Sequence, residues 1–128
     1  MRVKAMVVAV VLAGAGTSVR ADGLFLKLSS VKAKLAPEEA ADLAVQAVTT
    51  RTVSLPTPEV WVDDGSGFRA RPELACPARD AVAVTPDRAV RTTCRLSLGQ
   101  PGVFRIRLRY RVGDRVFETN KVTLEVLS

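Results

Sequence analysis

Histidine is absent from the 128 residues, and this absence limits the chemistry open to the chain. A Ser-His-Asp or Cys-His hydrolase is excluded, because both need an imidazole as general base. Only two cysteines are present, so no set of Cys and His residues can complete a tetrahedral zinc site. We therefore predict no enzyme activity, no catalytic residues, no metal and no cofactor.

Aromatic residues are also few, with four Phe, one Tyr and one Trp. Valine, leucine and alanine must fill most of the interior. A hydrophobic content of 48% is nevertheless ordinary for a globular protein and argues against wholesale disorder. After loss of a targeting segment, about one hundred residues would remain, which suits a single domain.

The first residues have the pattern of a secretory signal. Arg2 and Lys4 precede a short apolar run at residues 5–13, and Val19-Arg20-Ala21 fits the site that a signal peptidase cleaves. A membrane span needs about 20 apolar residues, more than this run supplies. We expect residues 1–21 to be a cleaved signal peptide and residues 22–128 to be one periplasmic or secreted domain without a membrane span.

A strong excess of either charge is lacking once the signal is removed. Arg2, Lys4 and Arg20 leave with it, so the formal charge falls from +6 to +3, with 16 Lys+Arg against 13 Asp+Glu. So small an excess does not favour nucleic acid as a partner. We expect the partner to be another envelope or extracellular protein, or an acidic polymer.

Cys76 and Cys94 form an even pair in a chain bound for an oxidising compartment. That context favours a disulfide between them. Closing a loop of this length stabilises a fold by roughly 3 kcal/mol in the chain-entropy model.

Short segments of alternating apolar and polar residues, separated by Gly and Pro turns, predict strands along the chain. Residues 36–50 fit either a helix beginning at Pro37 or a strand over residues 42–49, and the alternation favours the strand. Residues 68–71 read as an edge strand that Pro72 ends. The predicted fold is all-β: a single antiparallel β-sandwich of about seven strands, immunoglobulin-like, with one disulfide.

The clearest pattern is a hairpin over residues 104–126 that turns at Gly113-Asp114. A two-residue turn would place Tyr110 opposite Phe117. A three-residue turn would pair Ile106 with Val122, and burial favours this second register. It turns Glu118 and Asn120 inward, which a bulge around residues 119–120 or a polar edge of the core there would relieve, and it puts Phe117 on the outer face, beside Arg111.

Three segments resemble the immunoglobulin-like and fibronectin-like sandwiches of bacterial envelope proteins, over residues 24–127. Trp61 stands on the presumed third strand, where such domains place a core Trp. Residues 101–106 are similar to the lead-in to the sixth strand, and residues 119–126 to the closing strand. The resemblance implies the architecture only, because Val45 and Ile106 stand where antibody-type domains have their disulfide, and such sandwiches host many functions.

Four arginines alternate with apolar residues in the hairpin. Residues of like parity on a strand face the same way, so the four form a candidate basic binding ridge about 20 Å long. The ridge can bind an acidic polymer, a carboxylate-rich protein or anionic headgroups. A solvated face paired with acids such as Glu118 or Glu125 explains the same pattern and is the commoner outcome. The members are Arg105, Arg107, Arg109 and Arg111.

A second candidate binding site is the loop that contains Asp63, Asp64, Ser66 and Phe68. Neighbouring carboxylates in such a loop usually form turns, and their spacing matches no known calcium loop. The sequence thus predicts an exported, non-enzymatic binding or accessory module of the cell envelope. The alternative is an inhibitor of an exported protease that presents residues 55–58 and 65–68.

The signal-peptide assignment predicts a mature chain that begins at Asp22. Intact-mass measurement of the exported product checks it. A product that retains residues 1–21 would disprove export by signal cleavage.

Overall fold

The computed structural model describes residues 23–128, which form an all-β fold. The strands are β1 (Leu24–Ser30), β2 (Lys34–Leu35), β3 (Ala41–Thr49), β4 (Val53–Leu55), β5 (Glu59–Asp63), β6 (Phe68–Ala75), β7 (Val82–Val84), β8 (Val90–Leu96), β9 (Gly102–Val112), β10 (Arg115–Glu118) and β11 (Val122–Val126). The eleven strands exceed the predicted seven, partly because β2 was not foreseen and the hairpin's return arm is split into β10 and β11. The predicted signal peptide lies outside the described residues.

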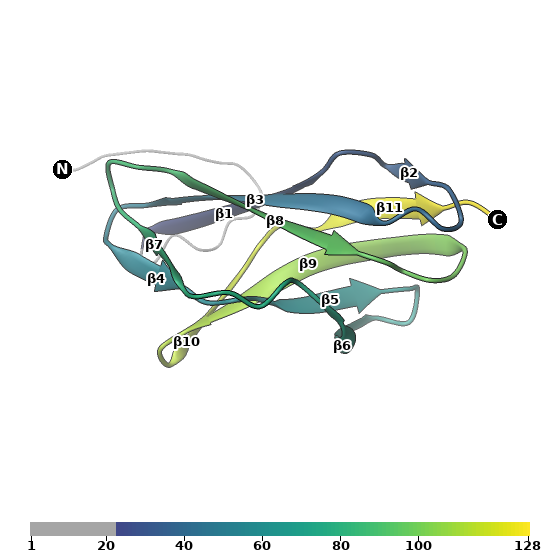
Figure 1. Cartoon of the computed structure of the whole chain (residues 1–128). Coiled ribbons are helices and arrows are strands. Elements are labelled where there is room, and N and C mark those ends of the chain that lie inside the picture. Colours follow the sequence, from purple (N-terminus) through teal and green to yellow (C-terminus); the bar gives the residue numbers. More distant parts are fainter. Residues whose placement is uncertain (1–22) are drawn as a thin grey trace.

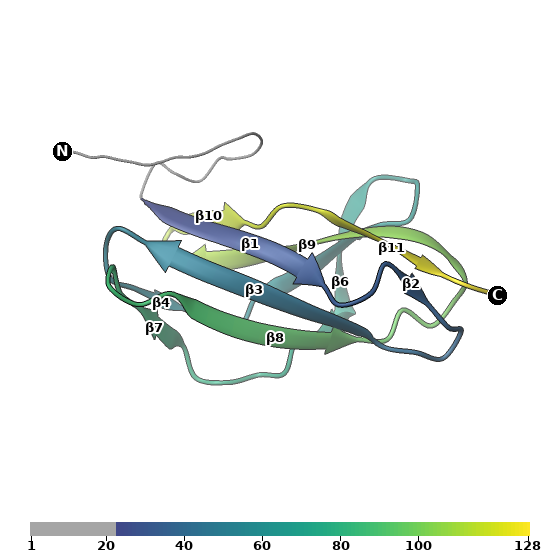
Figure 2. The same cartoon turned by 90° about the horizontal axis from the view of Figure 1, so that it is seen from above.

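The strands form three sheets. A three-stranded sheet has the order β1-β3-β8, a six-stranded sheet has the order β2-β11-β9-β5-β6 with β10 beside β9, and β4 pairs with β7. Every pair is antiparallel except β2 with β11. The three-stranded sheet lies over β9 and β5 (Figures 1 and 2). Within residues 23–128 there is no helix that could cross a bilayer.

One hydrophobic core lies between the two larger sheets and receives every second side chain of β1, β3, β5 and most of β9. Each large apolar side chain that is buried there contributes about 1.5–3 kcal/mol. The alternation fixes the faces of β9: Phe104, Ile106, Leu108 and Tyr110 point into the core, and the arginines point outward. The main contributors are Leu24, Leu28, Leu43, Val45 and Leu96 from the smaller sheet and Val60, Val62, Phe104, Ile106, Leu108, Tyr110 and Leu124 from the larger.

The ambiguous stretch at residues 36–50 is a strand, as the alternation predicted. Residues 37–38 form a turn, and β3 begins at Ala41. Leu43, Val45 and Ala47 are all buried against the core. Only a period of two directs these three residues to one face.

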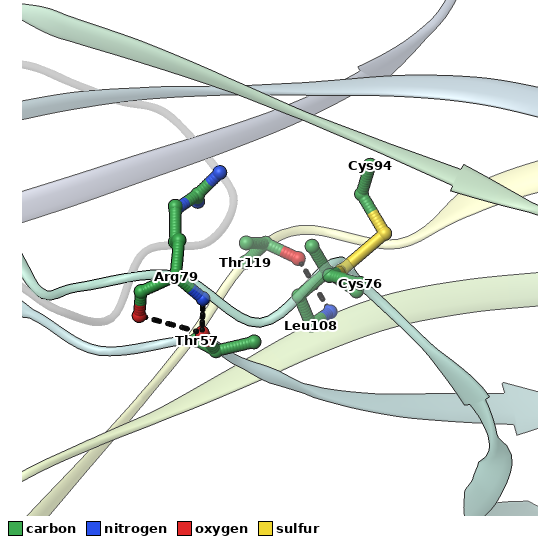
Figure 3. The surroundings of a disulfide bond; sticks show 6 residues. All are labelled: Thr57, Cys76, Arg79, Cys94, Leu108 and Thr119. Carbon is green, nitrogen blue, oxygen red and sulfur yellow. Dashed lines mark hydrogen bonds between the residues drawn. A yellow bond between two sulfur atoms is a disulfide. The ribbon is translucent and has the colours of Figure 1, made fainter.

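The disulfide between Cys76 and Cys94 is confirmed (Figure 3). Cys76 follows β6 of the larger sheet, Cys94 lies on β8 of the smaller sheet, and their Cα atoms are 4.9 Å apart. Both are buried. The bond therefore ties the two facing sheets together on the side of β8.

Strand β6 does not end at Pro72, contrary to the prediction. It continues to Ala75, which pairs with Glu59, whereas Ala70 pairs with Trp61. Four residues, 71–74, thus stand opposite Val60 alone, and Pro72 lies within this bulge. Proline is tolerated because β6 is an edge strand and the bulge requires no ladder hydrogen bond from it.

The terminal hairpin combines both registers. Gly113-Asp114 form a two-residue turn, so Phe117 lies opposite Tyr110 and is buried. The prediction that Phe117 would face outward beside Arg111 was wrong. Beyond residues 119–121 the pairing shifts by one residue, and Ile106 pairs with Val122 as predicted. The predicted bulge reconciles the two halves, because each half then buries its own apolar residues.

Asn120 in this bulge connects the two larger sheets. Its Oδ1 accepts a hydrogen bond from Leu28 N at 2.7 Å, and its Nδ2 donates to Leu28 O at 3.0 Å. Thr119 Oγ1 accepts from Leu108 N at 3.0 Å beside it. The interruption between β10 and β11 thus supplies a partner for the backbone of the edge strand β1.

Replacing Asn120→Ala leaves both backbone groups of Leu28 without a partner. We expect a loss of about 1–3 kcal/mol in the free energy of unfolding. Urea denaturation measures it, with Gln46→Ala, an exposed change on β3, as control. If both variants lose equal stability, Asn120 does not hold β1.

Candidate functional site

The outer face of the larger sheet is organised around β9, which pairs with β5 on one side and with β10 and β11 on the other. The candidate ridge is present on this face as a row, but its members differ in exposure. Arg105 and Arg111 have side chains that are 53% and 59% exposed, whereas those of Arg107 and Arg109 are 24% and 22% exposed. Only the ends of the row are therefore freely solvated.

The two central arginines lie over aromatic rings. The guanidinium carbon of Arg109 is 3.8 Å from the ring centre of Trp61, and that of Arg107 is 4.4 Å from the ring centre of Phe68. The Lys121 ammonium lies 5.8 Å from the same Phe68 ring. Each contact at a partly exposed site is worth about 0.5–1 kcal/mol. Together they favour these positions of the two guanidinium groups over the alternatives open to a free arginine side chain.

Trp61 does not occupy the core position that the resemblance implied. Val60 and Val62 are buried on β5, so Trp61 between them points to the outer face. The register sets it directly opposite Arg107 and leaves Arg109 as its diagonal neighbour. Cross-strand diagonals are within reach of long side chains, which explains the stack.

Carboxylates on neighbouring strands brace the row. Glu118 accepts hydrogen bonds from Arg109 Nε at 2.9 Å and Nη2 at 2.6 Å and lies 3.6 Å from Arg107 Nη1. Asp63 lies 3.6 Å from Arg105. The expected pairing with Glu118 is present, whereas Glu125 forms no ion pair with the row among the described residues.

Glu59 links the tryptophan to the end of the row. Its carboxylate accepts a hydrogen bond from Trp61 Nε1 at 3.2 Å and another from Arg111 Nε at 3.3 Å. These bonds, first that of Trp61 and then that of Arg111, lower the pKa of Glu59. The sequence analysis did not single out Glu59 or Trp61 for this face. The sequence pattern that could have revealed them is their spacing: Glu59, Trp61 and Asp63 are alternate residues, so a strand places all three on one side of β5.

The second candidate site, the loop between β5 and β6, is organised by its own carboxylates. Asp63 Oδ1 accepts hydrogen bonds from Gly65 N at 2.8 Å and Gly67 N at 3.0 Å, and these lower the pKa of Asp63. The Ser66 hydroxyl and N–H bind Asp64 and lower its pKa. Phe68 is the first residue of β6, and its ring lies under Arg107 of the arginine row. The carboxylates are thus turn-formers, and no group of three potential metal-ligating residues occurs in residues 23–128.

The other loop that the inhibitor alternative requires is held against the molecule. Thr57 Oγ1 accepts a hydrogen bond from Arg79 N at 3.3 Å and donates to Arg79 O at 3.5 Å (Figure 3). Pro58 is buried. Residues 55–58 are therefore tied to the segment that follows the disulfide.

The sequence matches no protein-family model and no curated protein. Solved structures do resemble it. The sporulation control protein Spo0M from Bacillus subtilis matches with a TM-score of 0.58 and 7% identity, over 83% of this chain and 50% of Spo0M. The chain thus spans half the length of that protein.

A CARDB domain from Pyrococcus furiosus, solved in complex with di-metal ions, matches with a TM-score of 0.52 and 14% identity. The match covers 87% of this chain and 98% of the domain. Both neighbours have β-rich folds of the immunoglobulin-like or cell-adhesion-like kind. At such identities the likeness establishes the fold alone.

The lowered pKa of Glu59 predicts a stability that depends on pH. Its contribution is present above the unfolded-state value, 4.5, and is lost as the pH falls through the lower folded-state value. Between pH 7 and pH 3, Glu59→Gln should therefore lose less stability than the wild type. Thermal unfolding at each pH measures this. Glu38→Gln is the control, because Glu38 is exposed and makes no ion pair among the described residues; an equal effect of both changes would contradict the role of Glu59.

Proposed function

We propose that residues 22–128 form an exported, non-enzymatic accessory module with an immunoglobulin-like sandwich architecture. Its binding surface is the outer face of the larger sheet, centred on the arginine row. It works in the cell envelope or outside the cell. Its partner is an acidic polymer or a carboxylate-rich protein.

The observation that carries this proposal is the bracing of the row. Arg107 and Arg109 are stacked on Phe68 and Trp61, and Glu118 contacts both. Side chains that are already ordered lose little entropy when a ligand binds. Tryptophan and arginine are also the residue types that contribute most to binding interfaces.

Arg105 and Arg111, at the ends of the row, have N–H donors that make no hydrogen bond to the described residues. Arg105 contacts Asp63 only at 3.6 Å, and Arg111 gives a single Nε hydrogen bond to Glu59. A guanidinium carries five N–H donors, so most donors of both residues face solvent. Two such groups about 20 Å apart can engage a polymer whose carboxylates repeat along its length.

Inhibition of an exported protease is the second candidate. The observation in its favour is the exposed loop at residues 64–67, which the Asp63 and Asp64 carboxylates hold in one shape. Residues 55–58 do not share this exposure. A panel of exported proteases assayed with the purified protein distinguishes the two candidates.

Binding of polygalacturonate, a carboxylate polymer without a peptide backbone, tests the main proposal. Arg105→Glu with Arg111→Glu should weaken binding about tenfold, because two exposed cation–carboxylate contacts become repulsive. Wild-type binding should fall as salt rises. Affinity electrophoresis in gels that contain the polymer measures both effects.

The matched control is Arg51→Glu with Arg88→Glu, at two exposed arginines in the turns that follow β3 and β7, which changes the net charge by the same amount. It should leave polygalacturonate binding close to the wild-type value. Equal losses in the two double variants would show attraction to net charge alone, and no wild-type binding would reject the acidic polymer.

A further inference from the structure

Strand β8 is an edge of the three-stranded sheet. It pairs with β3 along all seven of its residues, Val90–Leu96, and the order β1-β3-β8 leaves its other side without a strand. Figure 2 shows β8 at the margin of that sheet. It is among the longest strands in the fold that are paired on one side only, so it presents an extended row of backbone groups.

The ladder determines which backbone groups face the free edge. Leu28 directs both its N–H and its C=O to Asn120, away from β3. Val45, which lies opposite Leu28, must therefore direct its own groups toward β8, where Thr92 is its partner. Thr92 is thus bonded inward, and its neighbours on β8 are directed outward.

The free edge consists of the N–H and C=O groups of Arg91, Thr93 and Arg95. No hydrogen bond between described residues reaches these six groups from outside the ladder. All three side chains are exposed. The edge therefore presents three exposed side chains and their unpaired backbone groups to an added strand, which has to pass Cys76 where its Cα lies 4.9 Å from that of Cys94.

The charges around this edge favour an acidic occupant. Lys27, Arg91 and Arg95 are the cations of the three-stranded sheet, and Asp42 is its one acid. Asp42 pairs with Arg95 at 2.9 Å, whereas Arg91 forms no ion pair within the described part of the chain. An added strand with carboxylates would meet an uncompensated positive charge.

A second copy of this chain is a poor occupant. Antiparallel pairing of two β8 edges about Thr93 would place Arg91 opposite the second copy's Arg95. Like charges directly opposite one another destabilise a strand pair. The same two arginines that oppose self-association therefore attract a segment with acids at the matching positions.

We propose that the free edge of β8 binds an extended acidic segment of a partner protein as an added antiparallel strand. Backbone hydrogen bonds to Arg91, Thr93 and Arg95 provide the attachment, and acids opposite Arg91 and Arg95 select the sequence. This site lies on the smaller sheet and shares no residue with the arginine row. The test of this site is therefore independent of the test of the proposed function.

The probe is the blocked peptide Thr-Glu-Val-Thr-Val-Glu-Thr, whose two acids match the spacing of Arg91 and Arg95. In an NMR titration at saturating peptide, the amides of Arg91, Thr93 and Arg95 should exchange at least about tenfold more slowly. A peptide with Lys in place of both Glu should bind about tenfold more weakly. Arg91→Glu with Arg95→Glu should reverse that preference.

Two changes test the backbone contribution. Thr93→Pro removes the central N–H of the free edge, where proline is tolerated because that group takes no part in the β3 ladder, and should abolish binding. A peptide that is N-methylated at the amides facing β8 should also fail to bind. This test uses the wild-type protein and so does not depend on the folding of a variant.

Three outcomes would overturn the proposal. The first is equal binding of the acidic and basic peptides. The second is a set of shifts confined to the arginine row on β9. The third is slow hydrogen exchange of the three amides in the absence of peptide. If this protection rises with protein concentration, a second copy occupies the edge. If it does not, other residues of this chain occupy it.

Discussion

The strict alternation of β9 is the constraint on which the other features depend. A pleated strand sends successive side chains to opposite faces, so Ile106 and Leu108 enter the core only if Arg105, Arg107 and Arg109 leave it. Because β9 lies inside the larger sheet, its outward side chains have neighbours on both sides. The arginines are consequently placed among acids and aromatic rings of β5, β6 and β10.

Two connections keep the sheets in register around this strand. The disulfide joins β8 to the end of β6, and Asn120 joins the β10–β11 bulge to β1. They lie at opposite margins of the three-stranded sheet, which consists of β1, β3 and β8. Each margin of the smaller sheet is thus fixed to the larger one. The side of β8 that faces away from β3 still has no strand beside it.

The two faces use charge differently. On the larger sheet every arginine of the row has a carboxylate within 3.6 Å, and the aromatic rings order the central pair. On the smaller sheet Arg91 has no such carboxylate among the described residues. Bracing prepares a surface for a ligand at low entropic cost, whereas an unpaired charge beside an open edge discourages self-association and selects a partner of opposite sign.

The sequence by itself determined the all-β class, a strand over residues 42–49, the disulfide and the pairing of Ile106 with Val122. The strands and their pairing follow from the alternation of apolar and polar residues within a segment. The disulfide follows from the presence of only two cysteines, which have no other cysteine to pair with. Only the tertiary structure decided that Trp61 lies outside the core, that Phe117 is buried, and that β6 passes through Pro72. Those outcomes depend on which strand lies alongside and in which register, and a local pattern carries no information about a neighbour distant in sequence.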